Sequence, residues 1–579
     1  MMDSDKPKVT PMYPAELVVA PAPLPGVRVI ENVYVTMRDG VRLAVDIFLP
    51  EKEGKYPALF STSPYMKDIQ RKPPHWSHAI ESGATAFYVP KGYIHVIAQG
   101  RGAGLSQGKW EWFGNAERTD GFDLIEWIAA QAWCTGRVGM IGDSYWSWTQ
   151  YHAAIAQPPH LACICQQDST PDFYRDVVYQ GGIFHHQFVA SWISYHTAMM
   201  AWPGAVEGKE EPMNLSWEAH KHPCDGPFYR ERSPWTQLER IKTPVLAIAP
   251  QGGAMHFRGQ LWAWPRIKAP KKLLIVPPTG FWSHVRYLTD RNLNRQMLRW
   301  FDYWLKGTDN GIMAEPDVAI FDAATRQWRY ENEYPIKRTR WEKLYFRANP
   351  EGPATQPPYG LLSKDAPGAE APDKYKMPDS YAQLTANKPV LAYATPPLDA
   401  DLRLWGPMSL TLYGSSTALD TAWYVKVADL KSDGSVGRVT RGILKASFRA
   451  VDAAQSGPGQ PFHPFEKQEL LEPGKIYEFQ IELTPICYTF KKGHRLQVQI
   501  ASEDIEYNSI HRQVDVMILP WPVENSIHHD AAHASHLILP VVPDEPEIKP
   551  VTSPVADINW PMPPGSWSPN TDGWPLVGD

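Results

Sequence analysis

The sequence predicts an α/β domain built on a parallel sheet, a helical cap inserted into that domain, and a C-terminal domain made of β-strands. Three observations predict this class. Strand-like and helix-like patterns alternate up to about residue 170, residues 173–234 interrupt the alternation, and period-two patterns dominate after residue 314. The length of 579 residues exceeds what one hydrophobic core serves, which favours two or three domains.

The first part of the α/β domain is assigned to residues 1–172. "NVYVTMRDGVRLAVDIFLP" alternates apolar and polar residues around Asp39-Gly40, as a β-hairpin does. The segment "ERTDGFDLIEWIAAQAW" has helical spacing, and the apolar run "RVGMIG" follows it. Strand, helix and strand in succession predict a parallel sheet with helices on its faces.

A strand over "LACICQQD", Leu161 to Asp168, precedes the interruption at residues 173–234, which is rich in His, Trp and Met and helical in pattern. We interpret this stretch as a cap over the sheet. The second part of the α/β domain is assigned to residues 235–313, because the strands "TPVLAIAP" and "KKLLIVPP" resume there. The amphipathic helix "RNLNRQMLRWFDYWLKG" closes the unit near Gly307.

Residues 314–579 predict a β-sandwich or jelly roll with an extended tail. Segments such as "MSLTLYGSS", "AWYVKVADL", "KIYEFQIEL" and "RLQVQIAS" alternate with period two, and turn clusters such as "KSDGS" separate them. The last thirty residues are dense in Pro and Trp, which is typical of chain lying extended on a surface.

Composition favours a small-molecule substrate. A net charge of -6 and a pI near 6.4 give no basic surface for nucleic acid or anionic lipid. The five cysteines are scattered without CxxC spacing, so neither disulfides nor a metal site are expected, and no motif calls for a cofactor. Without a signal-peptide pattern or an apolar run of membrane length, a cytoplasmic protein is expected. The exposed β faces and long tail are compatible with a homodimer.

Ser144 stands in "GRVGMIGDSYWSWTQYHAA", where a strand ending at Gly142 is followed at once by a helix. This is the setting of a nucleophile elbow, a turn that lifts a serine hydroxyl above the sheet edge. Trp146 occupies a position where a small residue is usual, so the turn must widen or the indole must point outward. The alternative is that Ser144 caps the helix and nothing more.

Two oxyanion donors are predicted next to this serine. The backbone N–H of Tyr145 is one, because it follows the nucleophile directly. The phenol of Tyr65 in "STSPYMKD" is the other, since the preceding strand should deliver it to the same sheet edge. Alternatively, Tyr65 is a surface residue of a turn.

Taken together, these residues resemble the cocaine esterase, α-amino-acid ester hydrolase and Xaa-Pro dipeptidyl-peptidase group of α/β-hydrolases. The resemblance is carried by "VTMRDGVRLAVDIFLP", "SPYMK", "GRGAGLSQG", "RVGMIGDSYWSWTQ", "PVLAIAP", "FDYWLKGTDNG", "WGPMSLTLYGSSTALDTAWYVKVADLKSDGS" and "FKKGHRLQVQIAS". It implies an α/β-hydrolase core, a helical cap and a C-terminal jelly roll. It also implies that Ser144 is the nucleophile, with Tyr65 and the Tyr145 N–H as the oxyanion hole.

The chain departs from this family at two positions. Members place a catalytic Asp after the strand matching "TPVLAIA" and a catalytic His after the strand matching "KKLLIV". Here Gly252 or Gly253 stands at the first place and Gly280 at the second, and no Asp or Glu lies between Thr243 and Leu288. Loss of any triad member lowers the rate by orders of magnitude, so the missing residues must be replaced or the chemistry must differ.

Three interpretations follow. In the first, which we favour, the triad has moved: His284 serves as base and Asp168 orients it, with His256 a second base candidate that is expected to pack structurally. In the second, Ser144, Tyr65 and a cap histidine, His185 or His186, polarise a substrate for lyase, isomerase or cyclase chemistry. In the third, the protein binds without chemistry. The favoured function is hydrolysis of an ester or amide of a small hydrophobic or aromatic molecule.

Overall fold

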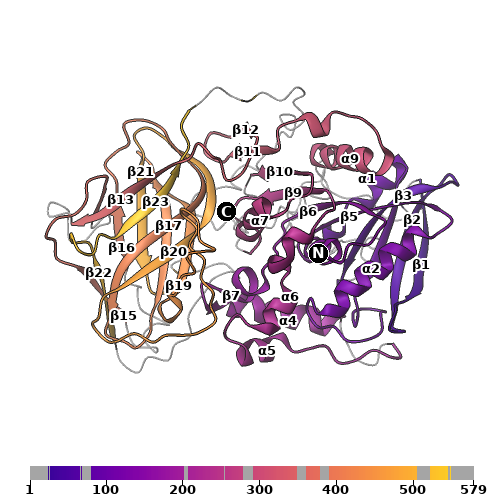
Figure 1. Ribbon diagram of the computed structural model, residues 1–579, viewed down its shortest axis with the longest axis horizontal. Coiled ribbons are helices and arrows are strands. Elements are labelled where there is room, and N and C mark those ends of the chain that lie inside the picture. Colours follow the sequence, from indigo (N-terminus) through magenta and orange to yellow (C-terminus); the bar gives the residue numbers. More distant parts are fainter. Residues whose placement is uncertain are drawn as a thin grey trace, which may run out of the picture.

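The computed structural model describes most of the chain. The described residues are 24, 26–65, 67, 80–200, 206–252, 255–277, 291–348, 360–377, 390–504, 522–544 and 548. They form a mixed sheet with helices on both faces, a cap, and a separate β domain (Figure 1).

The first sheet has ten strands in the order β1-β2-β4-β3-β5-β6-β9-β10-β11-β12. From β4 through β3, β5, β6, β9 and β10 to β11 the neighbours are parallel, and antiparallel strands flank them on both sides. The strands are β1 (Val27–Thr36), β2 (Arg42–Pro50), β3 (Tyr56–Ser63), β4 (Ile94–Gln99), β5 (Cys134–Asp143), β6 (Leu161–Gln167), β9 (Val245–Pro250), β10 (Lys271–Val276), β11 (Val318–Asp322) and β12 (Gln327–Glu331). The hairpin predicted around Asp39-Gly40 is confirmed as β1 and β2.

Helices cover both faces of this sheet, which explains why β5 and β6 are apolar almost throughout. α2 (Asn115–Ala129), α3 (Tyr145–Ala156) and α7 (Phe257–Ala263) pack into one apolar cluster with the sheet. α1 (Thr85–Tyr88) and α9 (Arg291–Lys306) contribute to a second cluster on the opposite face. Within the described ranges, no helix is both long and apolar enough to cross a bilayer.

The two strands after residue 313, β11 and β12, belong to the first sheet, whereas the sequence assigned them to the β domain. β11 pairs parallel with β10, and β12 returns antiparallel to β11. Strands this short carry a pattern compatible with either sheet, so periodicity alone could not place them. The first sheet therefore ends at Glu331.

The segment between β6 and β9 corresponds to the stretch that the sequence assigned to a cap, and we keep that name for it. It opens with a π-helix, Phe173–Val178, and a small hairpin, β7 (Tyr179–Gln180) and β8 (Ile183–Phe184). α4 (His186–Met200), α5 (Leu215–Lys221) and α6 (Pro227–Arg232) follow, grouped beside the hairpin in Figure 1, and the 3₁₀ helix Pro234–Arg240 leads back to the sheet. Aromatic residues of the cap share one continuous apolar cluster with residues near Ser144 and with the interior of the β domain.

The C-terminal β domain is a barrel, where the sequence predicted a β-sandwich or jelly roll. Nine strands close into a ring in the order β17-β20-β19-β18-β21-β16-β14-β13-β23, because β23 also pairs with β17, while β22 and β15 extend from β17. β17 can serve three neighbours because it is 15 residues long. β20 pairs along most of its length, whereas β23 pairs between Leu404 and Thr411 and β22 pairs between Tyr413 and Ser416. The strands are β13 (Arg340–Ala348), β14 (Gly360–Ser363), β15 (Asp373–Met377), β16 (Leu391–Ala394), β17 (Leu402–Ser416), β18 (Ala422–Leu430), β19 (Val436–Lys445), β20 (Tyr477–Phe490), β21 (Arg495–Ala501), β22 (Val523–His528) and β23 (His536–Val541).

Candidate active site

Ser144 occupies a sharp turn between β5 and α3. Its backbone has φ 56° and ψ −125°, a strained conformation for a residue with a side chain. Although Ser144 is at the N-cap position, its side chain makes no capping hydrogen bond. The backbone N–H of Ser144 donates to the carbonyl of Gln167 at 3.2 Å, which ties the turn to the end of β6. The simple helix-cap alternative therefore lacks the hydrogen bond that defines it.

Gly142 makes this turn possible. It has φ +155°, and a Cβ at this position would lie 2.4 Å from the Cβ of Trp146. Only glycine lets the strand and the first turn of α3 pass so close together. Trp146 is fully buried, so the indole is accommodated inside the molecule and not turned outward to solvent.

Tyr65 lies beside the serine turn. It follows β3, is only 3% exposed, and its ring packs edge-on against the ring of Tyr145 with 5.6 Å between centroids. Trp192 of α4 donates its Nε1–H to the Tyr65 hydroxyl at 3.0 Å. Burial, with added repulsion from Glu81 and Asp143, raises the pKa of Tyr65 well above its usual value, so the phenol stays a neutral donor. Tyr65 is thus not a surface turn residue.

Tyr145 is the first residue of α3. The first N–H groups of a helix have no acceptor inside the helix, so the Tyr145 N–H suits an oxyanion beside Ser144. Its side chain is held firmly: the hydroxyl donates to Glu117 at 2.9 Å and accepts from Trp110 Nε1 at 3.3 Å. Phe113 stacks on the same ring, with centroids 3.9 Å apart.

Asp168 follows β6 with φ +46° and is buried. Its Oδ1 lies 3.5 Å from Nδ1 of His256, which immediately precedes α7. Trp148, one turn along α3 from Ser144, donates to the Asp168 carbonyl at 3.3 Å and packs on the His256 ring at 5.2 Å. The structure therefore brings an acid and an imidazole together at the carboxyl edge of the sheet, and Trp148 of α3 contacts both residues.

The other sequence-predicted positions are placed as follows. His284 lies outside the described residues, as do Gly253 and Gly280, and Gly252 is described in a turn after β9 with φ +76°. His185 is buried with Nδ1 3.1 Å from the carbonyl of Val177, and burial lowers its pKa to about 3. His186 is exposed at the start of α4. Because of its lowered pKa, the His185 imidazole is uncharged at neutral pH.

Sequence reasoning missed Glu117, Trp148 and Trp192. Glu117 lies in the first turn of α2, and Phe113, whose N–H donates to it at 2.7 Å, has φ +65°. The preceding "WEWFG" is dense in aromatic residues, and this density could have indicated a packed aromatic cluster beside the serine turn. The contact of Trp192 with Tyr65 could not be found from local sequence, because it joins residues 127 positions apart.

Glu117 predicts a pH-dependent stability. Burial raises its pKa from about 4.5 to about 7, against the lowering effect of the Tyr145 hydroxyl. Between these two pH values the folded state keeps a proton that the unfolded chain releases, so stability falls as pH rises from about 4.5 to about 7 and is level above it. Glutamine does not titrate, so the free energy of unfolding of Glu117→Gln should not show this fall. The fall in the wild type is expected to reach about 3 kcal/mol, at about 1.4 kcal/mol per pKa unit.

Urea denaturation of both proteins from pH 5 to pH 8 measures this effect. Glu111→Gln, at a 40% exposed side chain in the preceding loop, is the matched control and should follow the wild type. Parallel pH dependence in wild type and Glu117→Gln would mean that Glu117 titrates normally.

Two family models match the chain in succession. The X-Pro dipeptidyl-peptidase (S15 family) model matches residues 39–286, which include the serine turn and the cap. The X-Pro dipeptidyl-peptidase C-terminal non-catalytic domain model matches residues 310–538, which include most of the barrel.

Individual proteins are similar to the chain over most of its length. Cocaine esterase from Rhodococcus sp. is 27% identical over 594 residues, covering 89% of this chain and 98% of the esterase. A CocE/NonD family hydrolase from Staphylococcus aureus has a TM-score of 0.78 at 25% identity, covering 89% of this chain and 94% of that chain. An α-amino acid ester hydrolase shares the fold with a TM-score of 0.68 at 19% identity, covering 93% of this chain and 100% of its own.

Both domains thus match in order, and nearly the full length of an esterase aligns with the chain. The chain has the CocE/NonD-type hydrolase fold with its C-terminal non-catalytic domain. The chain therefore carries an S15-family X-Pro dipeptidyl-peptidase domain followed by the C-terminal non-catalytic domain of X-Pro dipeptidyl-peptidases, and it is a hydrolase enzyme.

Proposed function

We propose that this chain is a serine esterase or amidase that cleaves the acyl bond of a small hydrophobic or aromatic molecule through Ser144. The observation that carries the proposal is a serine in a strained turn, without a capping bond, beside a buried and neutral phenol. Strain of this kind persists where the surrounding structure enforces it, which is typical of nucleophiles. The match to the X-Pro dipeptidyl-peptidase (S15 family) model supports hydrolysis as the reaction at this site.

In the proposed reaction, Ser144 Oγ attacks the acyl carbon while a histidine accepts its proton. The negative charge on the former carbonyl oxygen is stabilised by the Tyr65 O–H and the Tyr145 N–H. Collapse of this intermediate expels the alcohol or amine, which takes the proton back from the histidine. Water then attacks the acyl-enzyme by the same route and releases the acid, so Ser144 is regenerated.

Two histidines are proposed for the base, with Asp168 as the acid that orients it. His256 is supported by its Nδ1 contact with Asp168 at 3.5 Å, and its Nε2 is buried without a hydrogen-bond partner in the described part of the chain. His284 is supported by the sequence, where it follows the strand that precedes the catalytic histidine in relatives. A serine nucleophile uses one base, so a variant of each decides between them.

The substrate class rests on the aromatic residues around the turn. Trp192 lies 6.1 Å from Trp148 and 6.2 Å from Tyr145, measured between ring centroids. Flat hydrophobic surfaces of this kind favour apolar and aromatic acyl groups over charged ones.

A panel of 4-nitrophenyl esters tests the proposal. We expect release of nitrophenol from the acetate, butyrate and benzoate esters, and we expect the benzoate or butyrate ester to be preferred over a succinate half-ester. The assignment as an esterase or amidase would be contradicted if no ester releases nitrophenol and if the matching 4-nitroanilides, which test amide cleavage, also stay intact.

Tyr65→Phe should lower kcat without unfolding the protein. The variant keeps the ring contact with Tyr145 and loses only the hydroxyl, so one oxyanion donor disappears. Removal of one such donor costs about 10²- to 10³-fold in kcat with little change in KM. Steady-state kinetics on the best ester measures this, and Tyr56→Phe, at a half-buried tyrosine at the far end of β3, is the control. Unchanged kcat in Tyr65→Phe would remove Tyr65 from the oxyanion hole.

A further inference from the structure

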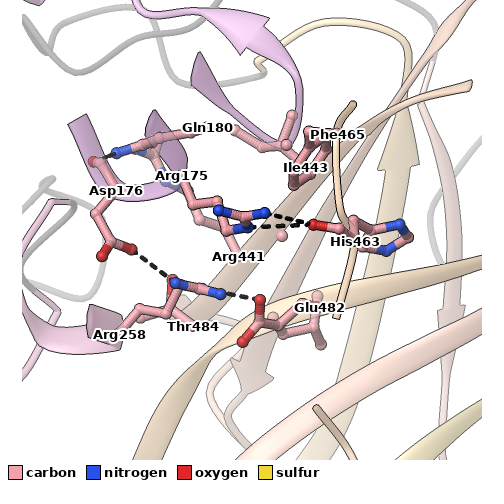
Figure 2. Close-up of a pocket in the computed structure, with 13 residues that line it drawn as sticks. Arg175, Asp176, Gln180, Arg258, Arg441, Ile443, His463, Phe465, Glu482 and Thr484 are labelled. Carbon is pink, nitrogen blue, oxygen red and sulfur yellow. Dashed lines mark hydrogen bonds and ion pairs between the residues drawn. The ribbon is translucent and has the colours of Figure 1, made fainter. Parts of the chain in front are cut away.

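Arg258 joins three parts of the molecule at one point. It lies in the first turn of α7, two residues after His256. Its Nη1 lies 3.0 Å from Oδ1 of Asp176 in the π-helix, and its Nε donates to Oε2 of Glu482 on β20 at 2.8 Å. Figure 2 shows the guanidinium between these two carboxylates, one from the cap and one from the barrel.

The same turn of α7 contacts the segment after β6, residues 168–176, at two further places. His256 lies against Asp168, and Gly259 packs so closely that a Cβ there would lie 2.2 Å from both Thr170 Oγ1 and Asp176 Oδ2. Thr170 in turn donates its hydroxyl to Asp176. The segment that carries Asp168 is therefore held against α7 by a charge pair, a close backbone approach and an acid–imidazole contact.

The charges make this arrangement depend on Arg258. The Asp176 side chain is 1% exposed and that of Glu482 is 14% exposed, so water screens neither carboxylate well. Burial raises the pKa of Asp176 to about 6 even though Arg258 opposes the rise. Without the guanidinium, two poorly solvated carboxylates would face each other across the domain boundary, and breaking a buried pair in this way displaces the groups that made it.

We propose that Arg258 and Glu482 are positioning residues for the acid that serves Ser144, so that the barrel takes part in catalysis through Glu482. Neither residue touches substrate in this proposal. Glu482 fixes Arg258, Arg258 fixes Asp176, and Asp176 fixes the segment that carries Asp168. The proposal rests on the proposed serine esterase function, and it holds whether His256 or His284 is the base, because Asp168 serves either one.

The test compares two glutamates of the C-terminal β domain, Glu482 on β20 and Glu466 in the segment before β20, in the intact chain. Glu482→Gln removes the charge that faces Arg258, whereas Glu466→Gln removes a different ion pair between the β domain and the cap, with Arg230 of α6, that does not touch α7. We expect Glu482→Gln to lower kcat about 10-fold with unchanged KM, and to slow phosphonylation of Ser144 by a fluorophosphonate to the same extent. Glu466→Gln should match the wild type in both.

A second variant keeps the proposal falsifiable if Glu482→Gln is mild. Arg258→Ala is expected to lower kcat about 100-fold, since displacement of a positioned group by about 1 Å costs this much. Guanidinium ion should restore part of the activity, because the removed side chain borders a cavity of about 70 Å³ that is also lined by Glu482 and Asp176. Sodium chloride at the same ionic strength should not restore it.

The outcomes separate this proposal from the one it rests on. A wild-type enzyme that neither cleaves esters nor reacts with the fluorophosphonate overturns the proposed function, and the positioning role with it. A reactive wild type whose kcat is unchanged by both Glu482→Gln and Arg258→Ala overturns the positioning role alone. A rise in KM without a fall in kcat would also overturn it, because the pair would then act on substrate binding.

Discussion

Replacing Ser144 by alanine is expected to lower kcat for ester hydrolysis by about 10⁶-fold, the scale seen when a serine nucleophile is removed. The change deletes only the hydroxyl, which makes no capping bond to α3, so the fold should be kept. The remaining rate would come from the oxyanion donors and from substrate binding alone. Steady-state hydrolysis of the best ester, with circular dichroism to confirm folding, measures both quantities.

Ser147→Ala is the matched control for this prediction. Ser147 lies on the same helix, is fully buried, and its hydroxyl has no hydrogen-bond partner among the described residues. Its loss should leave kcat within about twofold of the wild type, because it removes neither a charge nor a bond. Substantial ester hydrolysis in folded Ser144→Ala would show that the nucleophile lies elsewhere.

The second large effect concerns the acid and its base. Asp168→Asn is expected to lower kcat about 10⁴-fold, since an amide cannot hold a histidine in the tautomer that accepts the serine proton. His256→Ala and His284→Ala are measured beside it, and one of the two should lose activity on the scale of Ser144→Ala. Loss in His256→Ala assigns the base to the imidazole that lies 3.5 Å from Asp168, and loss in His284→Ala assigns it to the sequence candidate.

His220→Ala, at a histidine exposed on α5, is the control for removing an imidazole. Full activity in Asp168→Asn would remove Asp168 from the mechanism. Full activity in both histidine variants would contradict both proposed bases.

Local patterns predicted most of the elements that build the sheet. The amphipathic run before Gly307 forms α9, and its apolar side packs with the cluster beneath the sheet. The strand-turn-helix around Ser144 follows from Gly142 and the abrupt change of period. These features depend on residues close together in the chain, and there sequence is informative.

Pairing between distant segments could not be predicted in the same way. Period two indicates which faces of β17 are buried, but it does not say that β23 will return to close a barrel. His256 was expected to pack structurally, and only the fold of α7 against the segment after β6 brings its ring to Asp168. The bond between Trp192 and Tyr65 likewise depends on how the cap lies over the sheet.

The most direct test of the central claim is intact-mass analysis after treatment with a fluorophosphonate, followed by peptide mapping. The account predicts one phosphonyl group per chain, carried by the peptide that contains Ser144, absent from Ser144→Ala and retained by Ser147→Ala. A folded wild-type protein that gains no mass, or one that carries the group on another residue, would contradict it.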